Sequence, residues 1–182
     1  MNSANVRILP ATPDDVATIE RLARKTWPDT FGDILSAAQI EYMLQMMYRP
    51  DALLDQMQSG HVFHLLLASD ESFRSDYSGQ SRRFQAVGYV SHETDQAPGA
   101  TKIHKLYVLP EMQGRGFGRL LIDKVESIAT RNGQLALKLD VNYQNPAIRF
   151  YERMGFEKVE QYTTEIGEGY LMEDWRMVKL LS

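Results

Sequence analysis

The sequence predicts an α/β fold built as one domain over residues 1–182. Apolar patterns typical of strands and of amphipathic helices follow one another in the order β-α-α-α-β-β-β-α-β-α-β-β. An apolar strand passes through a glycine-rich turn directly into a helix near residue 118. With 182 residues, of which 43% are hydrophobic and 24% charged, the chain can bury one sizeable core, and no repeat or linker divides it.

The N-terminal half begins with a short strand over residues 6–9. Thr12 is placed to cap the first helix, whose apolar residues recur at helical spacing. That helix is expected to end near Trp27 and Pro28. The other segments predicted in this half are helices over 37–48 and 50–58, a strand over 61–68 and a polar loop over 70–83.

The C-terminal half holds the other five strands and the glycine-rich turn. A helix over 118–132 shows a clear apolar stripe, and a helix over 146–154 is stopped by Gly155. The predicted strands and turn of this half are strands over 84–92, 101–109, 135–141, 157–166 and 170–180, with a turn over 95–100.

Composition and charge narrow the classes of function. The chain has no cysteine, which excludes a disulfide framework, a thiolate metal site and a cysteine acyl-enzyme. A net charge of −4 argues against nucleic acid as a partner and is compatible with a cationic substrate. No signal peptide and no membrane-spanning window is seen, so we expect a cytoplasmic protein without a membrane partner. His61 and His64 lie three apart on a strand and point to opposite faces, so we expect no metal.

The glycine-rich turn has the character of a phosphate site. Gly114, Gly116 and Gly118 leave the backbone N–H groups uncovered, and the helix that follows adds the partial positive charge of its N-terminus. The dinucleotide motif G-x-G-x-x-G fails, because Arg119 stands at its third glycine. The P-loop string G-x-x-x-x-G-K-[ST] does not occur. The turn therefore indicates another kind of pyrophosphate ligand.

Two strings in order resemble a known family. Gln113-x-x-Gly116-x-Gly118, after a strand that ends in Val108-x-Pro110, resembles the acetyl-coenzyme A motif of the GCN5-related N-acetyltransferase (GNAT) superfamily. About thirty residues on, Asn145, Ala147, Tyr151 and the pair Gly155-Phe156 resemble its second core motif. The resemblance implies a central mixed, mostly antiparallel sheet of about seven strands, flanked by helices. It also implies direct transfer of acetyl from acetyl-coenzyme A to a primary amine, through a ternary complex.

The resemblance assigns the cosubstrate to particular residues. The backbone N–H of Val108 would polarise the thioester carbonyl beside a bulge that splays this strand from its neighbour. The residues that would bind acetyl-coenzyme A are Leu106, Tyr107, Val108, Gln113, Gly114, Arg115, Gly116, Phe117, Gly118, Arg119, Asn145, Ala147 and Tyr151.

Two residues are candidates for proton transfer. Tyr151 stands where relatives place a hydroxyl near the cofactor sulfur, and its phenol would be protonated at neutral pH; an aromatic that packs the last helix is the alternative. His104 stands where polyamine-acetylating relatives often carry a glutamate, and an unperturbed imidazole suits a general base. The alternative is that His104 is a half-buried structural histidine. Glu93 or another carboxylate would then remove the proton through a water molecule.

The acceptor pocket is expected between the first two helices and the last strands. Trp27 and Phe31, with Glu41, would form an aromatic and acidic pocket for an ammonium group. Residues 26–31 and 167–174 resemble the polyamine-acetylating PaiA-type branch. A polyamine or other small amine is thus the first expected acceptor. A protein N-terminus or lysine, and a non-catalytic acyl-coenzyme A sensor, are the alternatives, and the last two strands could pair across a homodimer.

Overall fold

The computed structural model describes residues 5–69, 84–97 and 99–181. Its elements follow the order that the sequence predicts, and several boundaries coincide with the predicted ones. The helices are α1 (Val16–Phe31), α2 (Ala37–Tyr48), α3 (Pro50–Gln58), α4 (Phe117–Arg131) and α5 (Ile148–Arg153). The strands are β1 (Asn5–Pro10), β2 (Val62–Ser69), β3 (Gln85–Ala97), β4 (Ala100–Val108), β5 (Ala136–Asn142), β6 (Glu157–Gly167) and β7 (Tyr170–Leu180).

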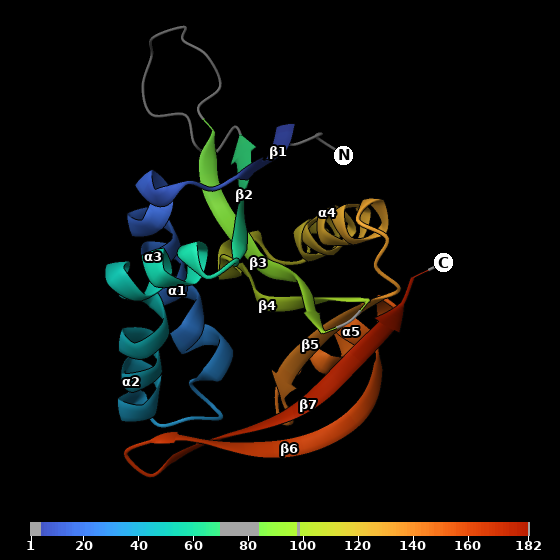
Figure 1. Ribbon diagram of the computed structural model, residues 1–182. Coiled ribbons are helices and arrows are strands. Elements are labelled where there is room, and N and C mark those ends of the chain that lie inside the picture. The colour runs from blue at the N-terminus through green and yellow to red at the C-terminus, as the bar shows by residue number, and fades with distance from the viewer. Residues whose placement is uncertain (1–4, 70–83, 98, 182) are drawn as a thin grey trace, which may run out of the picture.

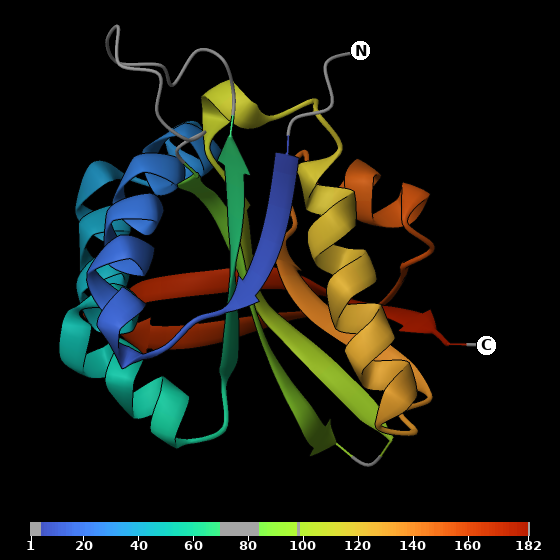
Figure 2. The same cartoon turned by 90° about the horizontal axis from the view of Figure 1, so that it is seen from above.

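The strands form one sheet in the order β1-β2-β3-β4-β5-β7-β6. Only β4 and β5 pair in parallel, so the predicted mixed and mostly antiparallel sheet is confirmed. Helices α1, α2 and α3 cover one face, while α4 and α5 lie on the other (Figures 1 and 2). The long β6–β7 hairpin extends under the first group of helices (Figure 1). Among the described residues, no helix is long and apolar enough to cross a membrane.

Helix α1 continues through Pro28 to Phe31, so the predicted end at Trp27 and Pro28 is wrong. Proline cannot donate the helical hydrogen bond to the carbonyl four residues earlier, but other hydrogen bonds hold the last turn. The hydroxyl of Thr30 donates to the Thr26 carbonyl at 2.8 Å, and the Gly32 N–H donates to the Pro28 carbonyl at 2.9 Å. Burial of Trp27 and Phe31 stabilises this last turn beyond what helix propensity alone allows.

Two other boundaries also differ from the prediction. Strand β3 continues to Ala97, so the turn expected over 95–100 is shorter. The helix expected from residue 146 begins at Ile148, because a turn comes first: Asn145 Oδ1 accepts the N–H of Ala147 at 2.9 Å. This short Asn-led turn takes the place of the first residues of the expected helix. The predicted loop over 70–83 lies outside the described residues.

An opening in the middle of the sheet positions the site. The register of β3 and β4 pairs Ser91 with Lys105 and His92 with Ile103, so His104 is an extra residue in a β-bulge. Strand β4 pairs with β5 only as far as Ile103 and Leu139. Beyond that point β5 goes on pairing with β7, and among the described strands none pairs with the second half of β4 on this side. The splay that the sequence resemblance implies is therefore present.

Candidate active site

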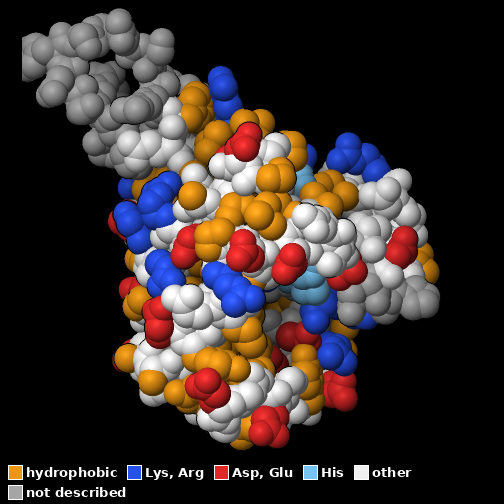
Figure 3. Space-filling model, turned by 60° about the vertical axis from the view of Figure 1, so that its left-hand side comes forward, with side chains coloured by type: hydrophobic (Ala, Val, Ile, Leu, Met, Phe, Trp, Pro, Cys, Tyr) orange, Lys and Arg blue, Asp and Glu red, His pale blue; other side chains and the backbone are white. Residues whose placement is uncertain are grey.

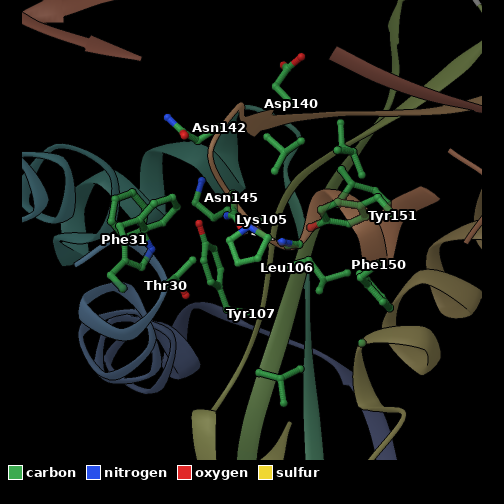
Figure 4. A pocket seen from close by; sticks show the side chains of 18 of the residues that line it. Thr30, Phe31, Lys105, Leu106, Tyr107, Asp140, Asn142, Asn145, Phe150 and Tyr151 are labelled. Atoms are coloured by element: carbon green, nitrogen blue, oxygen red, sulfur yellow. Dashed lines mark hydrogen bonds between the residues drawn. The ribbon is translucent and has the colours of Figure 1, made fainter. Parts of the chain in front are cut away.

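A cavity of about 920 Å³ occupies this opening. Its walls come from β4, the glycine-rich turn, β5 and α5, and from α1, α2, β6 and β7 on the other side. Figure 4 shows Tyr107 on β4, Tyr151 on α5 and Phe31 on α1 around the same space. All of the residues predicted to bind the cosubstrate line this cavity, except Arg115. Segments far apart in sequence thus meet in one site of a size usual for ligand pockets.

The three glycines of the turn meet two different structural requirements. Gly114 and Gly116 have positive φ angles of 73° and 82°, which favour glycine. A Cβ built on either would meet no protein atom within 4 Å, so the space above them is open to a ligand. A Cβ on Gly118 would instead lie 3.0 Å from the Phe150 ring. Gly118 therefore also serves the packing of α4 against α5, while the expectation that it uncovers N–H groups stays a prediction.

The end of β4 presents backbone N–H groups to the opening. The N–H of Leu109 donates to the Val87 carbonyl on the β3 side at 2.8 Å. Since such bonds alternate along an antiparallel strand, the N–H of Val108 is directed to the other edge, where β5 has parted from β4. The side chain of Gln113 donates to the Val108 carbonyl at 3.2 Å and ties the turn to the strand. This geometry suits a donor to a carbonyl oxygen between β4 and β5.

Tyr151 projects from α5 into the cavity from the side opposite Tyr107 (Figure 4). Its side chain is buried, and burial raises the pKa of its phenol to about 12. The hydroxyl therefore keeps its proton at any physiological pH and is available to donate it. That is the property required of a group that assists departure of a thiolate. The same ring also packs edge to face against Phe156, with ring centroids 5.9 Å apart.

His104 lies in the bulge of β4 and lines the cavity. Its Nε2 is 3.2 Å from a carboxylate oxygen of Glu93, and its ring stacks on His61 with centroids 4.0 Å apart. Burial, followed by the charges of His61, Lys102 and Lys105, lowers the pKa of His104 to about 3. The imidazole is thus neutral at neutral pH and a weaker base than its unperturbed value indicates. Its role as general base stays a prediction, but no change of rate near pH 6–7 is expected from it.

His61, Glu93 and His104 bring three metal-ligating atoms within 4.8 Å of one another. The two imidazole planes are only 26° from parallel and lie face to face. A metal ion would have to lie about 2 Å from a nitrogen of each imidazole, in the plane of each ring. The nitrogen lone pairs of two stacked rings point in nearly parallel directions, so they do not meet at one such ion. The arrangement suits two neutral imidazoles beside a shared carboxylate better than a metal centre.

The acceptor side of the cavity is aromatic. Trp27 and Phe31 are buried and line the cavity, with ring centroids 4.7 Å apart, as the sequence predicts. Trp27 also lies 5.5 Å from the Tyr48 ring and 6.0 Å from the Tyr107 ring. These rings offer several faces to a bound cation.

Glu41 is the predicted substrate residue that the structure does not bring to the cavity. It lies on the exposed side of α2, where it pairs with Arg24 at 3.2 Å and accepts from Gln45 at 2.7 Å. The reason is helical phase: Ile40 and Leu44 occupy the buried side of α2 and turn residue 41 outward.

Two aspartates that sequence reasoning did not assign line the cavity instead. Asp140 on β5 is paired with Lys102 at 2.7 Å and Arg176 at 3.2 Å. Burial alone would raise its pKa, but the hydrogen bond and charge of Lys102, with Tyr162 and Arg176, outweigh burial and lower it.

Asp174 on β7 is only 5% exposed. Burial, with the charge of Asp140, raises the pKa of Asp174 to about 6. A charged residue at an inward position of an alternating strand was the signal that could have identified it.

Asp174 predicts a measurable effect on stability. Its pKa rises from 3.8 to about 6 on folding, so its contribution to stability is present below about pH 4 and lost as pH rises through 6. Asp174→Asn should therefore raise the free energy of unfolding at pH 8 by up to about 3 kcal/mol, at roughly 1.4 kcal/mol per pKa unit. Urea unfolding at a series of pH values measures this. A gain that is the same at pH 4.5 and pH 8 would contradict it.

A family model described as "Acetyltransferase (GNAT) family" matches residues 21–156. That range begins inside α1 and includes the whole of the glycine-rich turn and the second motif up to Phe156.

Individual relatives are more distant. The chain is 39% identical over 99 residues to an uncharacterized N-acetyltransferase of Methanocaldococcus jannaschii, over 51% of this chain and 40% of that protein. It is 25% identical over 170 residues to the spermidine N(1)-acetyltransferase of Thermoplasma acidophilum, over 93% of this chain and 96% of that protein. Among solved structures, PaiA N-acetyltransferase from Thermoplasma acidophilum in complex with coenzyme A has a TM-score of 0.73. Its sequence identity is 23%, with 97% of this chain and 99% of that chain covered, and it shows a common fold.

Proposed function

This chain belongs to the acetyltransferase (GNAT) family, and from that premise we propose that it transfers acetyl from acetyl-coenzyme A directly to a primary amine, first of all that of a polyamine. The observation that carries the proposal is the parting of β4 from β5 next to the glycine-rich turn. A thioester placed in that opening meets the N–H of Val108 at its carbonyl, and its pyrophosphate meets the start of α4. Acetyl-coenzyme A is the cosubstrate.

Each of the two substrates is assigned to one half of the cavity. The cofactor half comprises the end of β4, the glycine turn and α5 with Tyr151. The acceptor half comprises the aromatic residues of α1 and α2 with β6 and β7. Holding both reactants at once supplies the proximity that direct transfer needs. The absence of cysteine in the chain is consistent with transfer without a cysteine acyl-enzyme.

A polyamine is proposed as acceptor for two reasons. The acceptor half combines aromatic faces with carboxylates, which suits an ammonium group. A relative matched along nearly the whole chain is a spermidine acetyltransferase. The positive charges of the two lysines in the cavity do not strongly disfavour binding of a cationic amine. Lys102 is neutralised by Asp140 at 2.7 Å, and Lys105 donates to Gln56 at 2.7 Å with its pKa lowered to about 8 by burial.

The proposal is tested by release of free thiol from acetyl-coenzyme A against a panel of amines. The panel contains spermidine, spermine, amino acids, aminoglycosides and short peptides, and the expected result is turnover with the two polyamines. Turnover with peptides alone would overturn the polyamine acceptor and leave the acetyltransferase. No turnover with any amine, together with cofactor binding by calorimetry, would favour an acyl-coenzyme A sensor. A location in the cytoplasm and a homodimer stay predictions.

A further inference from the structure

Asp174 is a buried carboxylate that faces the cavity without a partner. Its neighbour Asp140 is held by two cations, Lys102 and Arg176. Within the described part of the chain, no hydrogen bond or ion pair joins the Asp174 carboxylate to another side chain, although only 5% of the residue is exposed. Buried carboxylates are normally paired, so one left open at a cavity wall calls for an external cation.

The position of Asp174 fits that of a group beside the reacting amine. It lies on β7 opposite Asn142 of β5, the last residue of the strand that parts from β4. Tyr107 on β4 and Tyr151 on α5 line the same cavity as Asp174, and the charge of Asp174 contributes, after burial, Tyr48 and Tyr151, to the raised pKa of Tyr107. Asp174 and the expected acid thus share the cavity with this tyrosine. On the face in Figure 3, acidic side chains lie among hydrophobic ones, and basic side chains do not gather in one patch.

We propose that Asp174 binds the ammonium group of the acceptor and takes its proton before the nitrogen attacks the thioester. The proposal rests on the acetyltransferase function and names the residue that recognises the amine. The aromatic wall of Trp27, Phe31 and Tyr107 lines the same cavity as the carboxylate and offers further faces to a cation. His104, whose imidazole pairs with Glu93 instead, is then not required as the first proton acceptor.

Direct transfer from the protonated amine moves two protons away from its nitrogen. One proton leaves the R–NH₃⁺ group for the Asp174 carboxylate, and the freed lone pair forms a bond to the thioester carbon. The carbon–sulfur bond then breaks with its electrons on sulfur. The second amine proton reaches the sulfur through the Tyr151 hydroxyl, which gives one proton and receives one. The products are the amide and coenzyme A, and Asp174 returns its proton to solvent.

The titration of Asp174 predicts a particular pH dependence of the rate. With a pKa of about 6, the carboxylate is ionised above that pH and still basic enough to accept a proton. The rate should therefore rise as pH passes through about 6. The titratable and charged groups around it are Lys102 and Tyr107 on β4, Asp140 on β5, Tyr151 on α5, Tyr162 on β6, Arg176 on β7, and Asp29 on α1.

The test compares Asp174→Asn with Glu173→Gln, which removes one charge from the adjacent, exposed position of the same strand. With spermidine as acceptor, Asp174→Asn should lower kcat/KM about 100-fold or more and remove the rise near pH 6, as expected for loss of a general base. Glu173→Gln should change neither. Calorimetry should give both variants the wild-type affinity for coenzyme A, which shows that the fold and the cofactor half are intact.

Binding without turnover separates this proposal from the proposed function. Spermidine is titrated into each protein already saturated with coenzyme A, and Asp174→Asn should lose at least tenfold in affinity. That loss supports amine recognition by Asp174 even if no amine on the panel is acetylated. Equal spermidine affinity in wild type and Asp174→Asn, or a pH profile that keeps its rise near 6 in the variant, overturns the proposal. So does wild-type protein that does not bind spermidine.

Discussion

Replacement of Tyr151 by phenylalanine is expected to lower kcat about 100-fold, at the lower end of what a positioned proton donor contributes, with little change in the affinity for acetyl-coenzyme A. Burial raises the pKa of the Tyr151 phenol to about 12, whereas an ordinary thiol has a pKa of about 8.5. Complete proton transfer from an isolated tyrosine to the thiolate would thus be uphill. The hydroxyl acts by donating to the developing sulfur charge while it receives the proton of the amine.

The matched control for that variant is Tyr143→Phe, because Tyr143 is 38% exposed and does not line the cavity. Single-turnover rates with spermidine separate chemistry from product release. We expect the Tyr143 variant to behave as wild type. A Tyr151 variant with the wild-type single-turnover rate would show that the residue only packs α5, which is the alternative that the sequence left open.

Substitution of Gly116 by alanine is expected to weaken acetyl-coenzyme A binding at least tenfold. Gly116 precedes α4 in the left-handed region with φ of 82°, where an L-residue costs roughly 1–2 kcal/mol. The new Cβ would contact no protein atom within 4 Å, so the change acts on the turn and on whatever ligand approaches it. Calorimetric titration with acetyl-coenzyme A measures the loss.

Gly133 provides the control for Gly116. It follows α4 at the opposite end with φ of 70°, and its Cβ would also meet nothing within 4 Å. Gly133→Ala should cost similar stability and leave the affinity for acetyl-coenzyme A unchanged. Similar affinities for the two variants would contradict the assignment of the glycine turn to the cofactor.

Elements with a strong local pattern were predictable from the sequence. The second and third helices have the predicted bounds, because apolar residues at helical spacing and Pro50 fix where they begin and end. Helix α1 passes Pro28 because distant residues bury Trp27 and Phe31, and a local pattern does not report such packing. The His104 bulge likewise depends on the register between two strands.

The candidate site divides in the same way. The cofactor half is continuous in sequence around Gly116 and Tyr151, so its motifs indicate both the ligand and the residues. The acceptor half is assembled from helices and strands far apart in the chain. There the sequence prediction wrongly included Glu41, which helical phase turns outward, and it did not identify Asp174. The basicity of His104 also could not be predicted, since burial and His61 set its pKa.

Mass analysis of one incubation of the wild-type protein with acetyl-coenzyme A and spermidine tests the central claim most directly. We expect acetylated spermidine and free coenzyme A in equal amounts, with the mass of the protein unchanged, because the acetyl group passes directly between two substrates bound in one cavity. Loss of the acetyl group to water alone, or a stable acetylated protein in place of an acetylated amine, would contradict it.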